Sequence, residues 1–410
     1  MTSKALWLPL LWVIILGTRP VSLWLGMDAK LIDSASTEGN PVNRYLSLAM
    51  IAAGIVVLLR RRLDWQKIFA SNRWLFAFFI YCGLSAIWSD YGFVSFKRWV
   101  RDSGNAIMVL IVLSEKKPFE SIKAIFARYT RIAIPLSVLF IKYFPDLGRY
   151  YTRWTHEPAY CGVATFKNEL GCILFICGCF LVQEYIDARS DQNVQRNKID
   201  RWNRVLLILM VVWLLHMAHS STALVCLIIG TGILLVMQFS WGRRQVEYLG
   251  SYSLAVGLMA GILMSTPGLL GDGLKILGRD STLTGRTDIW ADVLGEPINP
   301  LIGTGYQSFW LGPATDRLHL TQAHNGYLET YLNGGLIGLG ILLAFLLSAA
   351  RRIKRRVQKG GPNGALLLCF FVTGFCYNFT EAMFSGLSLV WFVLLIVTVE
   401  WQDITGIEVA

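Results

Sequence analysis

The sequence predicts an all-α polytopic membrane protein with about twelve transmembrane helices. Of its 410 residues, 54% are hydrophobic and only 16% are charged, and the mean hydropathy is +0.49. Soluble domains carry about 25% charged residues and lack repeated apolar runs long enough to cross a bilayer. The composition therefore excludes an ordinary soluble domain.

Twelve apolar segments follow one another along the chain, several of them shorter than the usual span of roughly 17–25 residues. They are 6–25, 45–59, 74–88, 104–113, 122–144, 170–185, 205–218, 222–238, 252–265, 335–350, 365–378 and 384–401. The fourth is the weakest, and Lys97, Arg98 and Arg101 just before it predict an amphipathic interfacial segment leading into the helix. The expected organisation is nine helices in 1–265, a large loop in 266–334 and three helices in 335–410.

Basic clusters indicate the orientation, because they all fall on one side of an alternating twelve-span arrangement. The clusters are Arg60–Arg62 with Lys67 and Arg73, Lys116–Lys117, Arg196–Arg204, Arg243–Arg244 and Arg351–Arg356. The positive-inside rule makes that side cytoplasmic, with both termini inside and the large loop facing out. The net charge of +11 is then a signal of topology in a bilayer protein, and we expect no nucleic-acid partner.

Cysteine usage indicates neither a disulfide framework nor a metal site. Seven of the eight cysteines lie in apolar segments, and only Cys161 lies in an outward loop. Cys172, Cys177 and Cys179 share one apolar segment, but no histidine or carboxylate joins them. We expect packing cysteines there, and no bound metal.

The large outward loop is the expected site of the chemistry. It contains the strings Gly285–Trp290 and Ala323–Glu329, which bring an arginine, a histidine and several carboxylates into one loop of a membrane protein. Loops held by a rigid scaffold carry a large share of binding and catalytic residues, and charged groups at a membrane are costly unless they have a use.

Basic residues also lie on the predicted outer side, against the positive-inside tendency. They are Arg19, Arg44, Lys97, Arg98, Arg101, Arg149, Arg153, Lys167 and Arg286. Some of them fit side chains that reach lipid phosphates at helix ends, and others fit a pocket for an anionic substrate. The aromatics beside them, such as Tyr150, Trp154 and Tyr306, fit either an interfacial belt or surfaces that stack on sugar rings. Composition leaves both alternatives open.

Several short strings occur in an order that resembles the O-antigen ligase and polymerase superfamily. Gly285–Trp290 and His324–Glu329 are similar to its signature loop, and Gly303-Thr304-Gly305 between them resembles its Gly-x-Gly turn. Three upstream strings, Glu38–Pro41, Trp88–Asp90 and Phe166–Gly171, resemble the exopolysaccharide-polymerase-like branch. The histidine-containing string is the most specific part of this resemblance, which spans nearly the whole chain.

The resemblance implies a membrane glycosyltransferase of the GT-C type with a long, partly helical periplasmic loop. Such enzymes take a glycan from a polyprenyl diphosphate carrier and pass it to an acceptor hydroxyl, without nucleotide sugar, metal or cofactor. The implied product is either a polymer of exopolysaccharide or O-antigen repeat units, or a glycan ligated to lipid A core. A polyprenyl-diphosphate-linked oligosaccharide is the implied substrate, and a chain-length regulator or export machinery is a further partner to consider.

Two residues are suited to the central roles that the resemblance implies. A neutral histidine can remove the proton of the attacking hydroxyl near pH 7, which makes His324 the candidate base. Arg286 can grip a phosphate of the leaving diphosphate through two hydrogen bonds. A helix-capping histidine and an arginine that pairs with a structural carboxylate are the alternative interpretations.

Further candidates form the expected substrate-binding set. Lys167, with Arg149 or Arg153, adds positive charge for the diphosphate, and Glu329 orients the histidine or the acceptor. The other members are Asp288, Asn325 and Tyr306. Asn325-Gly326 is also a plain turn dipeptide, so part of the string fits a role in shaping the loop.

One departure separates the two products. Ligases of the superfamily tend to carry an additional arginine at the outer end of a middle span, and here that segment reads His219–Ala223 without one. This favours the polymerase-like branch over a ligase.

Two other classes of protein fit the sequence less well. A transporter or lipid-carrier flippase is expected to place ionisable groups at mid-membrane depth and to show paired broken helices, whereas most spans here are free of charge at mid-depth. A non-catalytic scaffold of a secretion complex does not need a histidine and an arginine in its outward loop. The enzyme is the favoured interpretation.

Overall fold

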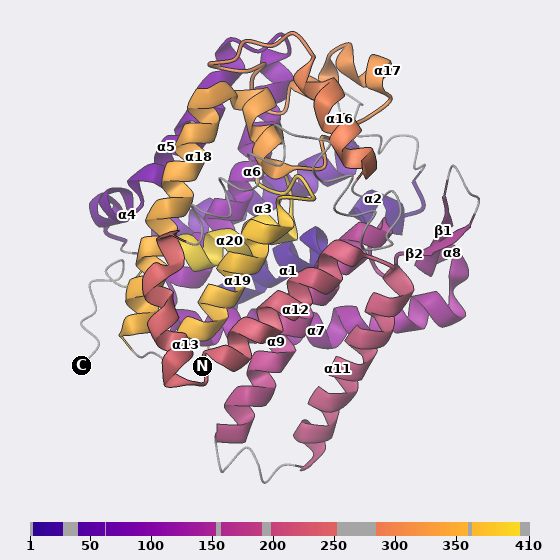
Figure 1. Cartoon of the computed structure of the whole chain (residues 1–410), viewed down its shortest axis with the longest axis vertical. Helices are drawn as coiled ribbons and strands as arrows, with labels where there is room; N and C mark the ends of the chain where they lie inside the picture. The colour runs from indigo at the N-terminus through magenta and orange to yellow at the C-terminus, as the bar shows by residue number, and fades with distance from the viewer. Residues whose placement is uncertain are drawn as a thin grey trace.

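The computed structural model describes residues 3–27, 40–61, 63–152, 157–190, 198–251, 284–359 and 363–401. They form a helical bundle with one small hairpin (Figure 1). The longer helices are α1 (Trp7–Leu16), α3 (Pro41–Arg60), α5 (Arg73–Leu84), α6 (Gly92–Leu113), α7 (Pro118–Tyr143), α9 (Lys167–Ser190), α11 (Lys198–Ala218), α12 (Ser221–Val236), α16 (Thr284–Leu294), α18 (Gly326–Gln358), α19 (Gly364–Tyr377) and α20 (Leu389–Thr398). The shorter ones are η1 (Lys4–Leu6), α2 (Val21–Trp24), α4 (Trp65–Ser71), η3 (Ser85–Ile87), α8 (Pro145–Gly148), α13 (Ser240–Gln245), η4 (Val246–Tyr248), η5 (Phe309–Leu311) and α17 (Ala314–Leu318).

Several of these helices are able to cross a membrane. Among the described residues, α3, α7, α9, α11 and α18 are long and apolar enough. The number is seven if each of two bent pairs, α4 with α5 and α12 with α13, is counted as one span. Apolar helices too short for that test include α19 and α20. The fold is therefore that of a multi-pass helical membrane protein, as the sequence predicts. The number twelve stays a prediction, and the expected ninth span, 252–265, lies outside the described residues.

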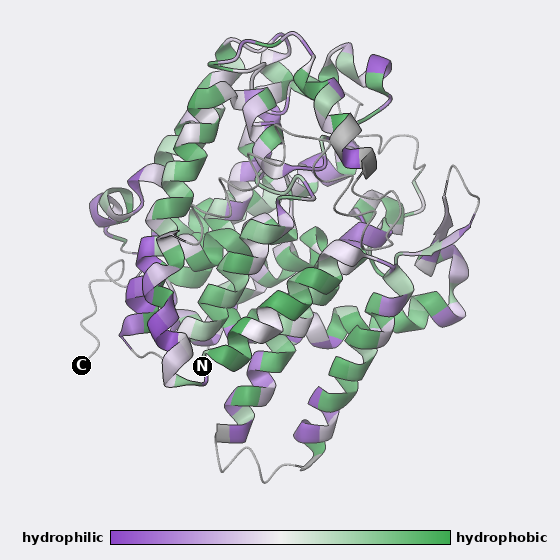
Figure 2. Cartoon of the chain, in the orientation of Figure 1, coloured by the Kyte–Doolittle hydropathy of each residue, from purple (hydrophilic) through white to green (hydrophobic). Residues whose placement is uncertain are grey.

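Large apolar side chains cover the outside of this bundle. Examples are Leu59 on α3, Leu209 on α11 and Ile228 on α12, which expose 74%, 60% and 63% of their surface. In water such faces would associate, whereas lipid tails accommodate them. Figure 2 shows hydrophobic residues along the middle of α18 and hydrophilic ones at the end that carries Arg351–Arg356.

The two helices α19 and α20 lie at the centre of the bundle (Figure 1). Every residue of α20 is buried, and its Trp391 contacts Phe78 and Phe79 of α5 and Phe345 of α18. These two helices position the segment 378–388 that joins them. That segment is part of the site described below.

A two-stranded antiparallel hairpin departs from the all-α prediction. Strand β1 (Arg149–Tyr151) pairs with β2 (Pro158–Tyr160), with Tyr150 opposite Ala159. Both strands lie in a predicted outward loop. Three residues per strand are too few to give a recognisable alternation of apolar and polar residues, so the sequence pattern did not reveal them.

Glycines allow the N-terminal part of α18 to pack closely against the preceding loop. Gly335 has φ of 61°, and a Cβ there would lie 2.2 Å from the backbone of Leu301. Gly303 faces it with φ of 66°, and its Cβ would lie 2.5 Å from the backbone of Asn333. The Gly-x-Gly turn is thus explained by backbone packing, because only glycine fits both the left-handed conformation and the short separation. It places the loop 302–310 against the first turns of α18.

Candidate functional site

The side chain of Glu381 is the centre of the site. It lies between α19 and α20 and is 3% exposed. Its Oε1 accepts hydrogen bonds from Arg286 Nη2 at 3.1 Å and Asn168 Nδ2 at 3.0 Å, and its Oε2 lies 3.4 Å from His324 Nδ1. Four segments that are far apart in the sequence therefore meet at one buried carboxylate.

The segment that carries Glu381 is fixed by its own polar residues. Asn378 Oδ1 accepts from Met383 N at 2.9 Å, and the Asn378 carbonyl accepts from Gly326 N at 2.8 Å. The hydroxyls of Thr380 and Thr222 lie 2.9 Å apart. Thr222 belongs to the segment in which superfamily ligases tend to carry an additional arginine.

His324 is held by the residues on both sides of it. The Ala323 carbonyl accepts from Trp290 Nε1 of α16 at 2.9 Å, and Ala323 N donates to Glu329 Oε2 of α18 at 3.1 Å. Asn325 is the N-cap of α18 and accepts from the amides of Tyr327 and Leu328. Because its neighbours are fixed in this way, the imidazole is directed at Glu381 while 27% of the side chain stays exposed.

The backbone of His324 is in the left-handed region, with φ of 50°. Residues other than glycine adopt this region at a cost of about 1–3 kcal/mol, and histidine is several-fold enriched there. The surrounding hydrogen bonds to Ala323 and Asn325 hold the residue in this conformation. Such outliers concentrate at functional sites.

Arg286 lies in the first turn of α16 and is 19% exposed. Among the described residues its guanidinium group pairs with Glu381 alone, through Nη2. A buried apolar cluster fastens α16 to η5 and to the start of α18, and its members include Trp290, Val293, Phe309 and Leu328. Arg286 and His324 are therefore positioned by the same packed unit.

Lys167 is the first residue of α9 and precedes Asn168 directly. Among the described residues its ammonium group makes no hydrogen bond or ion pair, whereas its amide donates to the hydroxyl of Tyr150 at 3.5 Å. The first turn of α9 is capped by Glu169, which accepts from Thr165 N at 3.0 Å. Lys167, a cation without a partner among the described residues, therefore directly precedes Asn168, which donates to Glu381.

The structure gives other predicted site residues structural partners. Arg149 donates from Nε and Nη2 to the Ile141 carbonyl at 3.0 and 2.7 Å, which fastens the hairpin to α7. Asn325 is fully buried as a helix cap. The carboxylate of Glu329 binds Trp310 Nε1 and Ala323 N, so it orients His324 through the backbone and not by direct contact.

Tyr306 belongs to a second polar cluster. Its hydroxyl donates to Asp102 Oδ2 at 3.0 Å, and Gln307 Nε2 donates to the same oxygen at 2.5 Å. Burial and the neighbouring carboxylate raise the pKa of Tyr306 well above its usual value. Arg153 lies outside the described residues, as does the side chain of Asp288, which is a residue of α16.

Glu381 and Asn168 were missed as site residues at the level of the sequence. The available signal for Glu381 was its place: it is the single charged residue in the segment 378–388 between the last two apolar stretches. Asn168 lies in a string that was recognised, but Lys167 beside it was the more conspicuous candidate. A neutral amide gives no charge signal, so its role became visible only through contact with Glu381.

Glu381→Gln is expected to lower the unfolding free energy by about 1–3 kcal/mol, because the amide leaves the charge of Arg286 without its buried partner. The measurement is thermal unfolding of the purified protein by tryptophan fluorescence. Glu296→Gln is the matched control, since Glu296 pairs with the exposed Arg317 and exposed pairs contribute about 0–1 kcal/mol. Equal shifts in the two variants would contradict the central role of Glu381.

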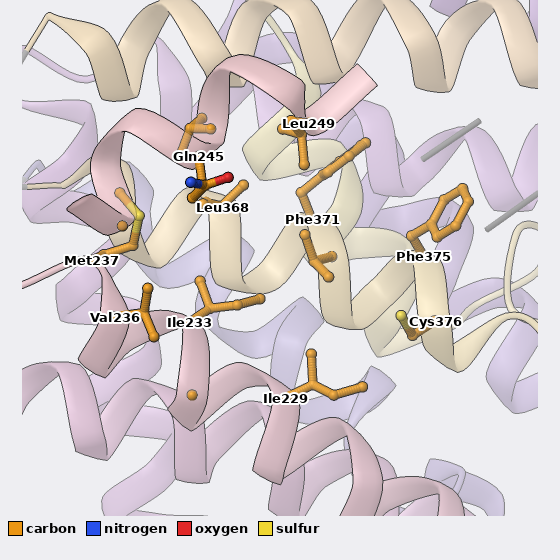
Figure 3. A pocket seen from close by; sticks show the side chains of 14 residues that line it. Ile229, Ile233, Val236, Met237, Gln245, Leu249, Leu368, Phe371, Phe375 and Cys376 are labelled. Carbon is orange, nitrogen blue, oxygen red and sulfur yellow. The ribbon is translucent and has the colours of Figure 1, made fainter. Parts of the chain in front are cut away.

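An apolar groove lies between α12, α19 and the α13–η4 segment (Figure 3). Its volume is about 410 Å³, and its lining includes Ile233 and Met237 from α12 or its end, Leu249, and Phe371 and Cys376 from α19. We call it the α12–α19 groove. It contains no charged side chain among its lining residues.

The end of this groove that is formed by Phe375 adjoins the site through aromatic contacts. Phe375 lines the groove, and its carbonyl accepts from the hydroxyl of Tyr327 at 3.1 Å. The Tyr327 ring lies 5.7 Å from that of Phe375 and 4.7 Å from that of Phe379. Tyr327 is three residues after His324, and Phe379 is two residues before Glu381. A continuous aromatic path therefore joins the groove to the polar site.

Two comparisons with known proteins show what this chain is similar to. Residues 205–343 match the family described as O-Antigen ligase, and this range includes both Arg286 and His324. The chain is also 24% identical over 305 residues to the exopolysaccharide production protein ExoQ of Rhizobium meliloti (strain 1021), covering 70% of this chain and 67% of that protein. The resemblance to the O-antigen ligase and polymerase superfamily that the sequence predicts is thereby confirmed.

Proposed function

We propose that this protein is a membrane glycosyltransferase that transfers a glycan from a polyprenyl diphosphate carrier to an acceptor hydroxyl. The observation that carries the proposal is the convergence of His324, Arg286 and Asn168 on the buried carboxylate of Glu381. A histidine oriented by a carboxylate can remove the proton of the acceptor hydroxyl. An arginine beside it can stabilise the negative charge on the departing diphosphate. Similarity to a protein of exopolysaccharide production favours polymerisation of repeat units.

In the proposed reaction the acceptor oxygen attacks the anomeric carbon of the carrier-linked glycan. His324 takes the acceptor proton at Nε2, while Nδ1 faces Glu381 and keeps the ring oriented. The bond between the anomeric carbon and the diphosphate oxygen breaks, and the electron pair leaves with polyprenyl diphosphate. Arg286 and Lys167 stabilise the charge that develops on the leaving group.

The second candidate product is a glycan ligated to lipid A core, which the O-Antigen ligase match favours. The chemistry is the same, and only the acceptor differs. In both cases we place the reaction on the periplasmic side of the bacterial inner membrane, with both termini in the cytoplasm. The segment His219–Ala223, in which ligases of the superfamily tend to carry an additional arginine, has none here, and this supports the polymerase.

The test is transfer by the purified protein in detergent, given a polyprenyl-diphosphate-linked repeat unit. Product length and released polyprenyl diphosphate are followed with and without lipid A core. Carrier-linked chains that lengthen without the core support the polymerase, and transfer only in its presence supports the ligase. No turnover with either acceptor would overturn the proposed function.

We further place part of the isoprenoid chain of the carrier in the α12–α19 groove. The groove is apolar, lies among helices of a membrane protein, and reaches the site through Phe375 and Tyr327. Gly232 lines it, and a Cβ at this position would meet no atom within 4 Å. A phenylalanine at position 232 can therefore fill the groove without a clash at its Cβ.

Gly232→Phe is expected to raise the KM for a long-chain carrier about tenfold, the equivalent of displacing about two methylene groups. The KM for a carrier with a short isoprenoid chain should not change. Gly340→Phe on α18 is the control, because a Cβ at Gly340 also meets no atom within 4 Å and this residue does not line the groove. Equal KM values for the long carrier in Gly232→Phe and wild type would refute the assignment of the groove. This result would not contradict the proposed transfer reaction.

A further inference from the structure

Two buried arginines lie one helical turn apart near the end of α18 that is remote from Glu381. Arg352 is 6% exposed and Arg356 is 8% exposed. Arg352 Nη1 donates to the Ser71 carbonyl at 3.2 Å and to Ser348 Oγ at 2.9 Å. Arg356 Nη2 donates to the Val399 carbonyl at 3.1 Å and to Glu400 Oε1 at 2.8 Å. These bonds join α18 to the α4–α5 bend and to the segment after α20.

The remaining donors of both guanidinium groups lack partners. Nε and Nη2 of Arg352, and Nε and Nη1 of Arg356, are shielded from solvent and find no acceptor among the described residues. The same is true of Nε1 of Trp401, whose ring lies 5.3 Å from the guanidinium carbon of Arg356. Buried polar groups in proteins are almost always hydrogen-bonded, and unpaired charged ones are the most costly.

The pattern of unpaired atoms has a specific geometry. The Nε and Nη2 hydrogens of one guanidinium point from the same edge, so Arg352 presents a complete fork for two oxygens of one anion. Residues at positions i and i+4 of a helix are neighbours on one face, so Arg356 lies beside that fork. Phosphate has the oxygens, the charge and the size to accept from both.

Charge at this end of α18 also favours an anion. The two guanidinium groups carry two positive charges, and Glu400 is the carboxylate that the structure pairs with Arg356. Arg351 and Arg355 on the same turns are exposed and add positive potential around the pair. The buried pair therefore carries excess positive charge, and the exposed arginines around it add further positive charge.

We propose that Arg352 and Arg356 bind the phosphodiester of an anionic phospholipid headgroup. The pair lies where the apolar stretch of α18 gives way to its basic end, which is the depth of the headgroups. On the proposed orientation this is the cytoplasmic leaflet, whose anionic lipids bind basic pockets between helices. The bound headgroup would tie α18 to the α4–α5 bend and to the segment after α20.

The test is thermal unfolding of the full-length protein in a neutral detergent, followed by tryptophan fluorescence. Phosphatidylglycerol, phosphatidylcholine with the same acyl chains, and inorganic phosphate are each titrated. We expect phosphatidylglycerol to raise the Tm by about 5 °C, and the other two to have little effect. In Arg352→Met the half-maximal concentration of phosphatidylglycerol should rise about tenfold, because the bidentate contact is lost.

Arg351→Met is the matched control, since it removes the same charge from the adjacent exposed position and should respond like wild type. Arg352→Lys keeps the charge but lacks the fork, and it replaces Arg352→Met if that variant does not fold. The proposal is overturned if phosphatidylcholine raises the Tm of wild type as much as phosphatidylglycerol does. It is also overturned if the half-maximal concentration of phosphatidylglycerol rises as much in Arg351→Met as in the Arg352 variants. If inorganic phosphate raises the Tm as much as phosphatidylglycerol does, the ligand is a free anion and the proposal of a lipid ligand is overturned.

Discussion

His324→Asn is expected to slow glycan transfer by about 100- to 10,000-fold, the usual range for removal of a general base. The substitution separates two properties of His324. Asparagine tolerates the left-handed backbone that His324 adopts, so the loop should keep its conformation. An amide cannot accept the proton of the acceptor hydroxyl, so the chemistry should fail while carrier binding persists. The measurement is the initial rate of polyprenyl diphosphate release at saturating carrier.

The control for this result is His319→Asn. His319 is also left-handed, with φ of 54°, and lies in the same predicted loop outside the site. We expect it to retain transfer near the wild-type rate. A His324→Asn variant that turns over within about threefold of wild type would rule out His324 as the base, since a general base contributes at least about 100-fold.

Arg286→Ala is expected to reduce transfer by about 100- to 1,000-fold, the effect of removing one donor that stabilises developing negative charge. The loss should appear mainly in kcat, because the charge on the leaving diphosphate is greatest in the transition state. Arg286→Lys keeps a cation beside Glu381 but not the planar set of donors, so its activity should lie between those of Arg286→Ala and wild type. Single-turnover rates with the carrier-linked repeat measure both.

Arg317→Ala is the matched control for Arg286. Arg317 belongs to α17 in the same loop, is about half exposed and pairs with Glu296. Its removal tests whether any positive charge in this loop contributes to kcat, or only that of Arg286. If Arg317→Ala lowers kcat as much as Arg286→Ala, the loss reflects the general field of the loop, and the specific role of Arg286 is refuted.

The sequence was sufficient for the fold class because apolar length is a strong signal. Helices α3, α7, α9, α11 and α18 all overlap predicted spans, and α18 differs in starting at Gly326, before its predicted apolar stretch. That difference has a physical reason: the first turns of α18 mix polar residues such as Glu329 and Asn333 with apolar ones, and they pack against the loop 302–310. Hydropathy detects apolar segments and not helical conformation, so it identified only the later, apolar part of α18.

The candidate site was predictable to the extent that its residues carry charge within a recognisable string. Arg286 and His324 were identified in this way, and the structure brings both to one carboxylate. The convergence itself could not be predicted, because it depends on α19 and α20 placing Glu381 opposite α9. Arg149 shows the converse: its charge suggested a ligand, whereas tertiary packing directs it to the Ile141 carbonyl.

The position of Glu381 along the chain has a consequence for biosynthesis. Protein synthesis proceeds from the N-terminus, so Asn168, Arg286 and His324 enter the membrane before the segment that carries Glu381 is translated. Until α19 is inserted, the histidine has no carboxylate to orient it, and the arginine has no buried partner. On the proposed mechanism, a nascent chain that lacks this segment is expected not to transfer glycan. We therefore expect activity to require insertion of the last helical hairpin.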